Sequence, residues 1–137
     1  MSVTNIFDLN LNQQNNNENY YCFFVNQGDY ATRTIQANLY ITYTVGSTRI
    51  EYNLTDETVK VLYEYTNSSG IVTITTEDSC TKATSIGNNV VTFLLPDDVL
   101  DNYGDVTGQI KIYQDVADIL NTASFRFRVN KSIISPV

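Results

Sequence analysis

The segment between residues 67 and 129 decides the fold, because short strand-forming runs alternate in it with turn sequences. Its most informative parts are Asn67-Ser68-Ser69-Gly70, Gly87-Asn88-Asn89-Val90-Val91-Thr92-Phe93-Leu94-Leu95-Pro96 and Thr122-Ala123-Ser124-Phe125-Arg126-Phe127-Arg128-Val129. The first is typical of a hairpin loop. The second ends at a proline, which lacks the N–H that a strand ladder needs. The third alternates apolar and basic side chains, as a strand with one buried face does.

The same alternation continues toward the N-terminus. Apolar and polar residues alternate from Ile35 to Val45, from Val59 to Tyr65 and, more briefly, from Ile6 to Leu11. Only Asp97 to Asn102, directly after a proline, favours a helical turn. About seven to nine short strands and no long amphipathic helix predict an all-β, antiparallel β-sandwich. We expect residues 1–137 to form a single domain, with flexible ends at 1–5 and 133–137.

Composition excludes several classes of function. The chain has 137 residues, of which 42% are hydrophobic and 17% charged, and 8 basic residues against 15 acidic ones give a net charge of −7. This charge argues against binding nucleic acid or an anionic membrane by bulk electrostatics. No apolar stretch approaches the length of a transmembrane helix. The segment that follows Met1 does not resemble a signal peptide, so we expect synthesis and folding in a cytosol.

The chain has few residues of the types used in catalysis or metal binding. The chain has no histidine, and Cys22 and Cys80 are its only cysteines, so a zinc site is close to excluded. We expect both cysteines to remain thiols in a reducing compartment. No nucleophile elbow and no phosphate-binding glycine loop occurs. The sequence therefore predicts no catalytic residue, no cofactor and no metal.

One acidic group has two interpretations. Calcium takes carboxylate oxygens, and four aspartates are clustered in the sequence: Asp97, Asp98, Asp101 and Asp105. Their spacing does not match the calcium loop of helix–loop–helix proteins. Capping of a helical turn that faces solvent is the favoured interpretation.

An aromatic run provides the candidate binding residues. Neighbouring residues of a strand point to opposite faces, so the side chains of Tyr20, Tyr21, Phe23 and Phe24 cannot all enter one core. Two interpretations stay open: a partner-binding surface, or a strand covered on both faces. The ten tyrosines of the chain also leave open a platform for sugar rings.

The order of these motifs resembles the N-terminal domain of phage baseplate upper proteins, found in tails of siphophages and prophages of Gram-positive bacteria. The resemblance covers about Ile6 to Ile133. It rests on these segments: Gln27-Gly28-Asp29, Leu39, Val59–Tyr63, Asn67–Gly70, Gly87–Pro96, Asp97–Leu100, Tyr103-Gly104, Gln109–Tyr113, Thr122–Val129 and Asn130–Ile133. The segment from Asp115 to Asn121 departs from it, because family members often have a glycine turn there.

The resemblance implies an immunoglobulin-like β-sandwich in the virion tail baseplate, made in the cytoplasm of the bacterial host. It implies a structural adaptor that docks to the distal tail protein and other baseplate proteins and supports receptor-binding proteins further out. It also implies homotrimers in the full-length assembly. The alternative from the residues is a carbohydrate- or receptor-binding β-sandwich module. A surface adhesin or pilin-like domain is a third hypothesis, and it would need an export signal.

Overall fold

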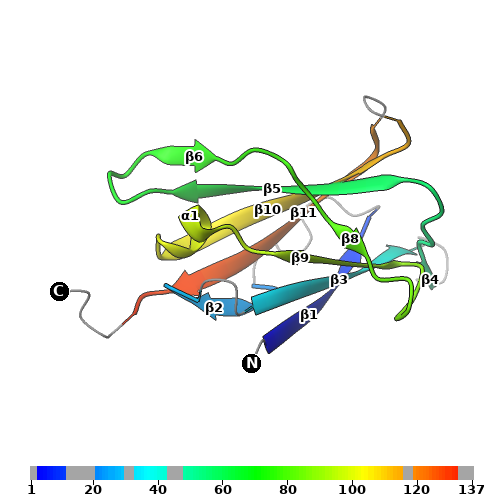
Figure 1. The fold of residues 1–137 in the computed structure, drawn as a ribbon, viewed down its shortest axis with the longest axis horizontal. Helices are drawn as coiled ribbons and strands as arrows, with labels where there is room; N and C mark the ends of the chain where they lie inside the picture. Colours follow the sequence, from blue (N-terminus) through cyan, green and yellow to red (C-terminus); the bar gives the residue numbers. More distant parts are fainter. Residues whose placement is uncertain (1–2, 12–20, 30–32, 43–47, 116–118, 133–137) are drawn as a thin grey trace.

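The computed structural model is a β-sandwich (Figure 1), and it describes residues 3–11, 21–29, 33–42, 48–115 and 119–132. The first sheet, which we call sheet A, has the order β1 (Val3–Asn10), β3 (Arg33–Thr42), β9 (Val90–Leu94) and β8 (Thr81–Lys82), and β4 (Arg49–Glu51) also pairs with β3. Sheet B has the order β2 (Phe24–Asn26), β11 (Ile119–Asn130), β10 (Gly104–Tyr113), β5 (Thr58–Thr66) and β6 (Val72–Ile74), and β7 (Asp78–Ser79) also pairs with β5. The short helix α1 (Asp97–Leu100) leads from sheet A to sheet B.

The predicted alternation is what builds the core. Along β5, Val59, Val61, Tyr63 and Tyr65 are buried while the residues between them are exposed or half-buried. Five of the six phenylalanines enter the core, where their rings contact one another: Phe7, Phe23, Phe93, Phe125 and Phe127. The two inner faces thus meet through aromatic rings, which bury more apolar area per residue than aliphatic side chains do.

The all-β sandwich is confirmed, with two corrections to its details. Both sheets are mixed, because β1 pairs with β3 and β2 pairs with β11 in parallel. Parallel neighbours need a crossover connection, and here the chain passes through sheet B between β1 and β3. The described residues form eleven strands, more than the seven to nine expected. Five of these have only two or three residues, which is too short for a period of two to show.

The predicted helical turn is also confirmed. Helix α1 follows Pro96, carries two aspartates in its first turn and buries Val99 and Leu100. Gly104 does not simply end it, as expected, but begins β10 with a φ of 127°, a conformation that favours glycine.

The turn at Gln27 ties this end of the sandwich together. The Gln27 side-chain amide donates to the Asp101 carbonyl (2.8 Å), and its oxygen accepts from the Ser132 N–H (3.2 Å). The N–H of Gly28, which has a φ of 89°, donates to the Leu100 carbonyl (3.0 Å). One turn therefore connects the end of α1 to the chain that leaves β11.

A buried hydroxyl gives the first prediction. Tyr63 is 1% exposed, and its hydroxyl has no hydrogen-bond partner among the described residues. A buried polar group without a partner costs free energy, so Tyr63→Phe should raise the free energy of unfolding by about 1 kcal/mol. Urea unfolding of the two proteins measures this difference. A loss of stability in the variant would mean that the hydroxyl is satisfied.

Candidate docking surface

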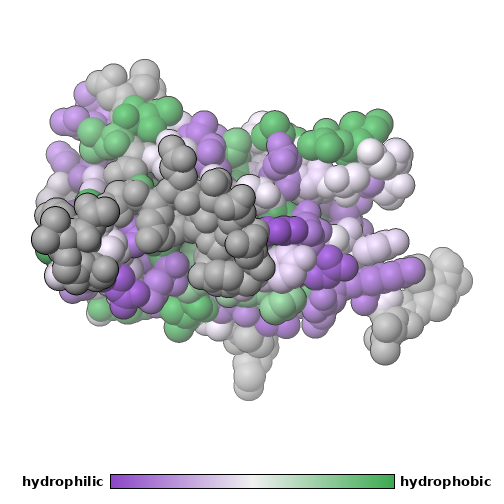
Figure 2. All heavy atoms as spheres, turned by 180° about the vertical axis from the view of Figure 1, so that it is seen from behind, coloured by the Kyte–Doolittle hydropathy of each residue, from purple (hydrophilic) through white to green (hydrophobic). Residues whose placement is uncertain are grey.

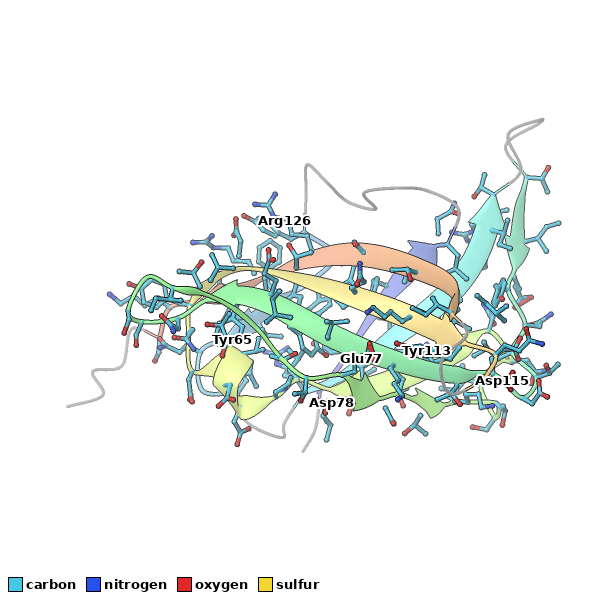
Figure 3. All side chains as sticks on the ribbon, turned by 90° about the horizontal axis from the view of Figure 1, so that it is seen from above. Tyr65, Glu77, Asp78, Tyr113, Asp115 and Arg126 are labelled. Atoms are coloured by element: carbon cyan, nitrogen blue, oxygen red, sulfur yellow. The ribbon has the colours of Figure 1, made fainter. Side chains whose placement is uncertain are left out.

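The outer face of sheet B is the candidate functional surface, and Figure 3 looks onto it. One register row crosses four of its strands: Arg126, Thr107, Glu64 and Ile74. At about 4.8 Å per strand, the two ends of this row are roughly 14 Å apart. Between them lies a depression of about 140 Å³ lined by residues that include Leu62, Thr107 and Ser124. The face is therefore continuous, with an aromatic and basic group at one edge and aliphatic side chains at the other.

The first group, which we call the aromatic–arginine patch, consists of Tyr21, Phe24, Asp105, Arg126 and Arg128. The Tyr21 hydroxyl donates to Asp105 Oδ1 (2.7 Å), and both arginines form ion pairs with the same carboxylate, Arg128 at 2.8 Å. The Arg126 guanidinium lies 5.1 Å from the centre of the Tyr21 ring. The rings of Tyr21 and the half-exposed Phe24 form a T-shaped pair with their centres 5.3 Å apart. Asp105 thus holds an aromatic pair and two cations in one arrangement.

These contacts change the titration of Asp105. Partial burial raises the pKa of this carboxyl, but hydrogen bonds from Tyr21, Arg126 and Arg128 outweigh burial, and the pKa lies below its ordinary value. A folded-state pKa below the unfolded one stabilises the protein at pH values above the unfolded pKa, which is about 3.9. That contribution is lost as the pH falls through the folded-state pKa.

We therefore expect Asp105→Asn to lower the free energy of unfolding at pH 7 by at most about 1 kcal/mol, because the pairs are partly exposed and screened. The difference from the unchanged protein should shrink as the pH falls below about 4. Urea unfolding across this pH range measures it. A difference that stays constant with pH would show that the carboxylate charge has no part in the effect.

The four predicted partner-binding residues do not all lie on one surface in the structure. Tyr20 lies outside the described residues. Tyr21 and Phe24 are on the surface and in contact, so their role in binding stays a prediction. Phe23 needs a correction: it is 6% exposed and stacks on Phe127 at 4.6 Å, so it faces the core and cannot belong to an exposed surface.

Sequence reasoning missed the second group, which we call the β6 edge: Ile71, Val72 and Ile74. The exposed fractions of these side chains are 61%, 62% and 62%. Figure 2 shows two groups of apolar side chains at the top of the molecule, one over β6 and one over the beginning of β11. The available signal was a run of ten residues without charge, from Asn67 to Thr76. The hairpin predicted around Asn67–Gly70 is confirmed, because β6 pairs with β5.

Among the described residues, no three or more Cys, Asp or Glu side chains form a group that could hold a metal ion. Asp97, Asp98 and Asp101 are all exposed to solvent. A hollow of about 480 Å³ is lined by Asp78, Phe93, Leu94 and several hydroxyl side chains. Within the described parts of the chain, no helix is both long and apolar enough to cross a membrane.

The surroundings of the Cys80 thiol make it less reactive and do not activate it as a nucleophile. Burial, and after it the nearby charge of Asp78, raises the pKa of Cys80 to about 12. Reactive cysteines have lowered pKa values, because the thiolate is the attacking form. At pH 8 we expect Cys80 in a Cys22→Ser protein to react with iodoacetamide about a thousandfold more slowly than in denaturant. Mass spectrometry follows the reaction, and equal rates in both conditions would contradict the burial of this thiol.

Comparison with known proteins supports the fold. No protein-family model matches the chain, and no curated protein matches it in sequence. Among solved structures, the N-terminal domain of phage TP901-1 ORF48 is similar, with a TM-score of 0.67 and 15% sequence identity. The likeness covers 96% of this chain and 100% of that domain. The resemblance found in the sequence is thus confirmed for the fold: the neighbour is also the N-terminal domain of a phage protein.

Proposed function

We propose that this chain is a non-enzymatic structural adaptor of a phage tail baseplate. Synthesised in the host cytoplasm, it docks to the distal tail protein at the tail hub and connects the receptor-binding proteins at the baseplate periphery to it. The observation that carries the proposal is the likeness, over the whole domain, to the N-terminal domain of a phage protein. The ordered motifs that resemble baseplate upper proteins support the same assignment. Further copies of the chain, as a homotrimer, and other baseplate proteins are the additional partners proposed.

The surface chemistry supports docking. The outer face of sheet B offers exposed Phe24, Val72 and Ile74 on a rigid sheet, which suits contact with another folded protein. The mechanism needs surface complementarity alone. The raised pKa of the Cys80 thiol is the reverse of what nucleophilic catalysis requires.

Binding of carbohydrate is the second candidate, and the tyrosine rings count against it. A sugar platform needs open aromatic faces, yet four tyrosine rings each have a cation over one face. The cation lies 4.0 to 5.4 Å from the ring centre in these pairs: Arg49 over Tyr40, Lys60 over Tyr113, Arg126 over Tyr21 and Lys131 over Tyr103. These cation–π contacts occupy faces that a sugar ring would stack on.

Light scattering on a sizing column tests the proposal, first with the chain alone and then with the distal tail protein of the same genome. We expect a stable complex of larger mass. A chain that elutes unchanged in the presence of that protein would refute the adaptor function. A glycan array would then test the second candidate.

A further inference from the structure

The β6 edge offers backbone hydrogen-bonding groups as well as apolar side chains. β6 ends the strand order of sheet B and pairs with β5, with Tyr65 opposite Thr73. The bonds on either side of this pair run from Asn67 N–H to the Ile71 carbonyl and from Thr75 N–H to the Tyr63 carbonyl, both 2.9 Å. Residues 71, 73 and 75 therefore direct their backbone groups toward β5. Because these groups alternate along a strand, those of Val72 and Ile74 point away from the sheet.

β6 is short, which limits strand addition, but it lacks the other usual protections of an edge strand. Natural edge strands carry charged side chains, proline or bulges that prevent another strand from adding to them. The run from Asn67 to Thr76 contains neither charge nor proline, whereas β8, at the edge of sheet A, includes Lys82. Strand addition uses outward backbone groups such as those of Val72 and Ile74, whose side chains are also exposed: main-chain bonds give affinity and side chains give specificity.

Carboxylates flank the edge on both sides. Glu64 lies directly opposite Ile74 in the register and is exposed on the outer face. On the other side, Asp98 and Asp101 lie near Tyr65, the residue opposite Thr73. The pKa of Tyr65 is raised, first by burial and then by the charges of these two carboxylates. A hollow of about 320 Å³ separates Asp101 from the loop at residues 67–70. A strand that adds to β6 would therefore lie near carboxylates at two positions.

The ion pairs that the cations form among the described residues do not include Glu64 or Asp98. All eight have partners elsewhere: Arg33 with Asp29, Arg49 with Asp8, Lys111 with Glu77, Arg126 and Arg128 with Asp105, Lys82 with the carbonyls of Thr55 and Glu57, and Lys60 and Lys131 over tyrosine rings. Among the described residues, neither Glu64 nor Asp98 has an ion-pair partner. The potential at the edge is therefore negative. A second copy would bring the same carboxylates and be repelled, whereas a basic strand would be attracted.

We propose that the β6 edge binds an extended strand of a partner protein, aliphatic in its centre and flanked by lysine or arginine, which adds to sheet B as a further strand. This inference deepens the proposed docking function and rests on it. It identifies the chemistry of the segment that the partner contributes.

A peptide titration tests the proposal without the partner protein. The probe alternates valine and threonine over five residues between two terminal lysines, and the matched control has glutamates in place of the lysines. In the amide NMR spectrum we expect the lysine peptide to shift residues 71–75 first. We expect the glutamate peptide to bind at least about tenfold more weakly, and added salt to reduce this difference.

Three variants of the chain sharpen the result. Val72→Pro removes an outward N–H that the β5 ladder does not use, so it should abolish peptide binding, whereas Val72→Thr keeps the N–H and should retain it. Glu64→Lys reverses one flanking charge on an exposed side chain and should move the preference toward the glutamate peptide. The Glu64→Lys variant keeps the test informative if the proline variant does not fold.

Three results would overturn the inference. They are no shift at residues 71–75 up to about 1 mM peptide, equal binding of the two peptides, or self-association of the unliganded chain that protects residues 71–75. The peptide and the distal tail protein can fail separately. If the chain binds the peptide but not the distal tail protein, the strand-addition site is supported and the proposed assembly is refuted. If it binds the distal tail protein but not the peptide, docking uses another surface.

Discussion

Replacing Phe125 with alanine is expected to lower the free energy of unfolding by about 4 kcal/mol. Phe125 is 1% exposed and lies at the centre of the aromatic core. Its ring centre is 4.9 Å from that of Phe7 and 6.1 Å from those of Phe93 and Phe127. Truncation leaves a cavity between the two sheets that rigid rings on both sides cannot close.

Phe24→Ala is the matched control for this prediction. It removes the same ring from a side chain that is 50% exposed, so the loss of stability should stay within about 1 kcal/mol. Thermal unfolding by circular dichroism compares the two, and Phe125→Ala should lower Tm by more than about 10 °C. Equal effects of the two substitutions would contradict the assignment of Phe125 to the core.

The second large effect is expected from Gly108→Ala. A methyl group on this residue would lie 2.2 to 2.6 Å from three atoms of the Phe125 ring, far inside van der Waals contact. The ring cannot swing away, because other core rings surround it. We expect this overpacking to cost about 3 kcal/mol.

A double substitution separates this clash from other effects of losing a glycine. In a Phe125→Ala background the added methyl group has space, so Gly108→Ala should cost much less there than alone. Thr107→Ala, on the same strand but facing solvent, controls for strand propensity. Additive losses in the double variant would show that the methyl group and the ring do not meet.

Sequence periodicity predicted the parts of the fold in which one side chain in two is buried. The strands at 35–42, 59–65 and 123–129, the stop before Pro96 and the turn at 97–100 all follow from local patterns. The parallel pairings and the short strands do not, because they depend on where a segment meets the other sheet. Periodicity shows only that a segment is half-buried.

The candidate surface was predictable only in part. Alternation required some of the aromatic run to face outward, and Tyr21 and Phe24 do. It could not reveal that Asp105, which is 84 residues away, would hold Tyr21 in place. Nor could it show that the uncharged run at 67–76 would become an edge, since strand order is a property of the whole fold.

Electron microscopy of intact virions tests the central claim most directly. Particles induced from the strain that encodes this chain would be purified and labelled with antibodies against residues 1–137, alongside particles from a deletion of the gene. We predict label at the tip of the tail on the first set and, on the second, tails that lack the peripheral baseplate. Purified particles that contain no trace of the chain, together with normal baseplates in the deletion, would contradict a role in the phage tail.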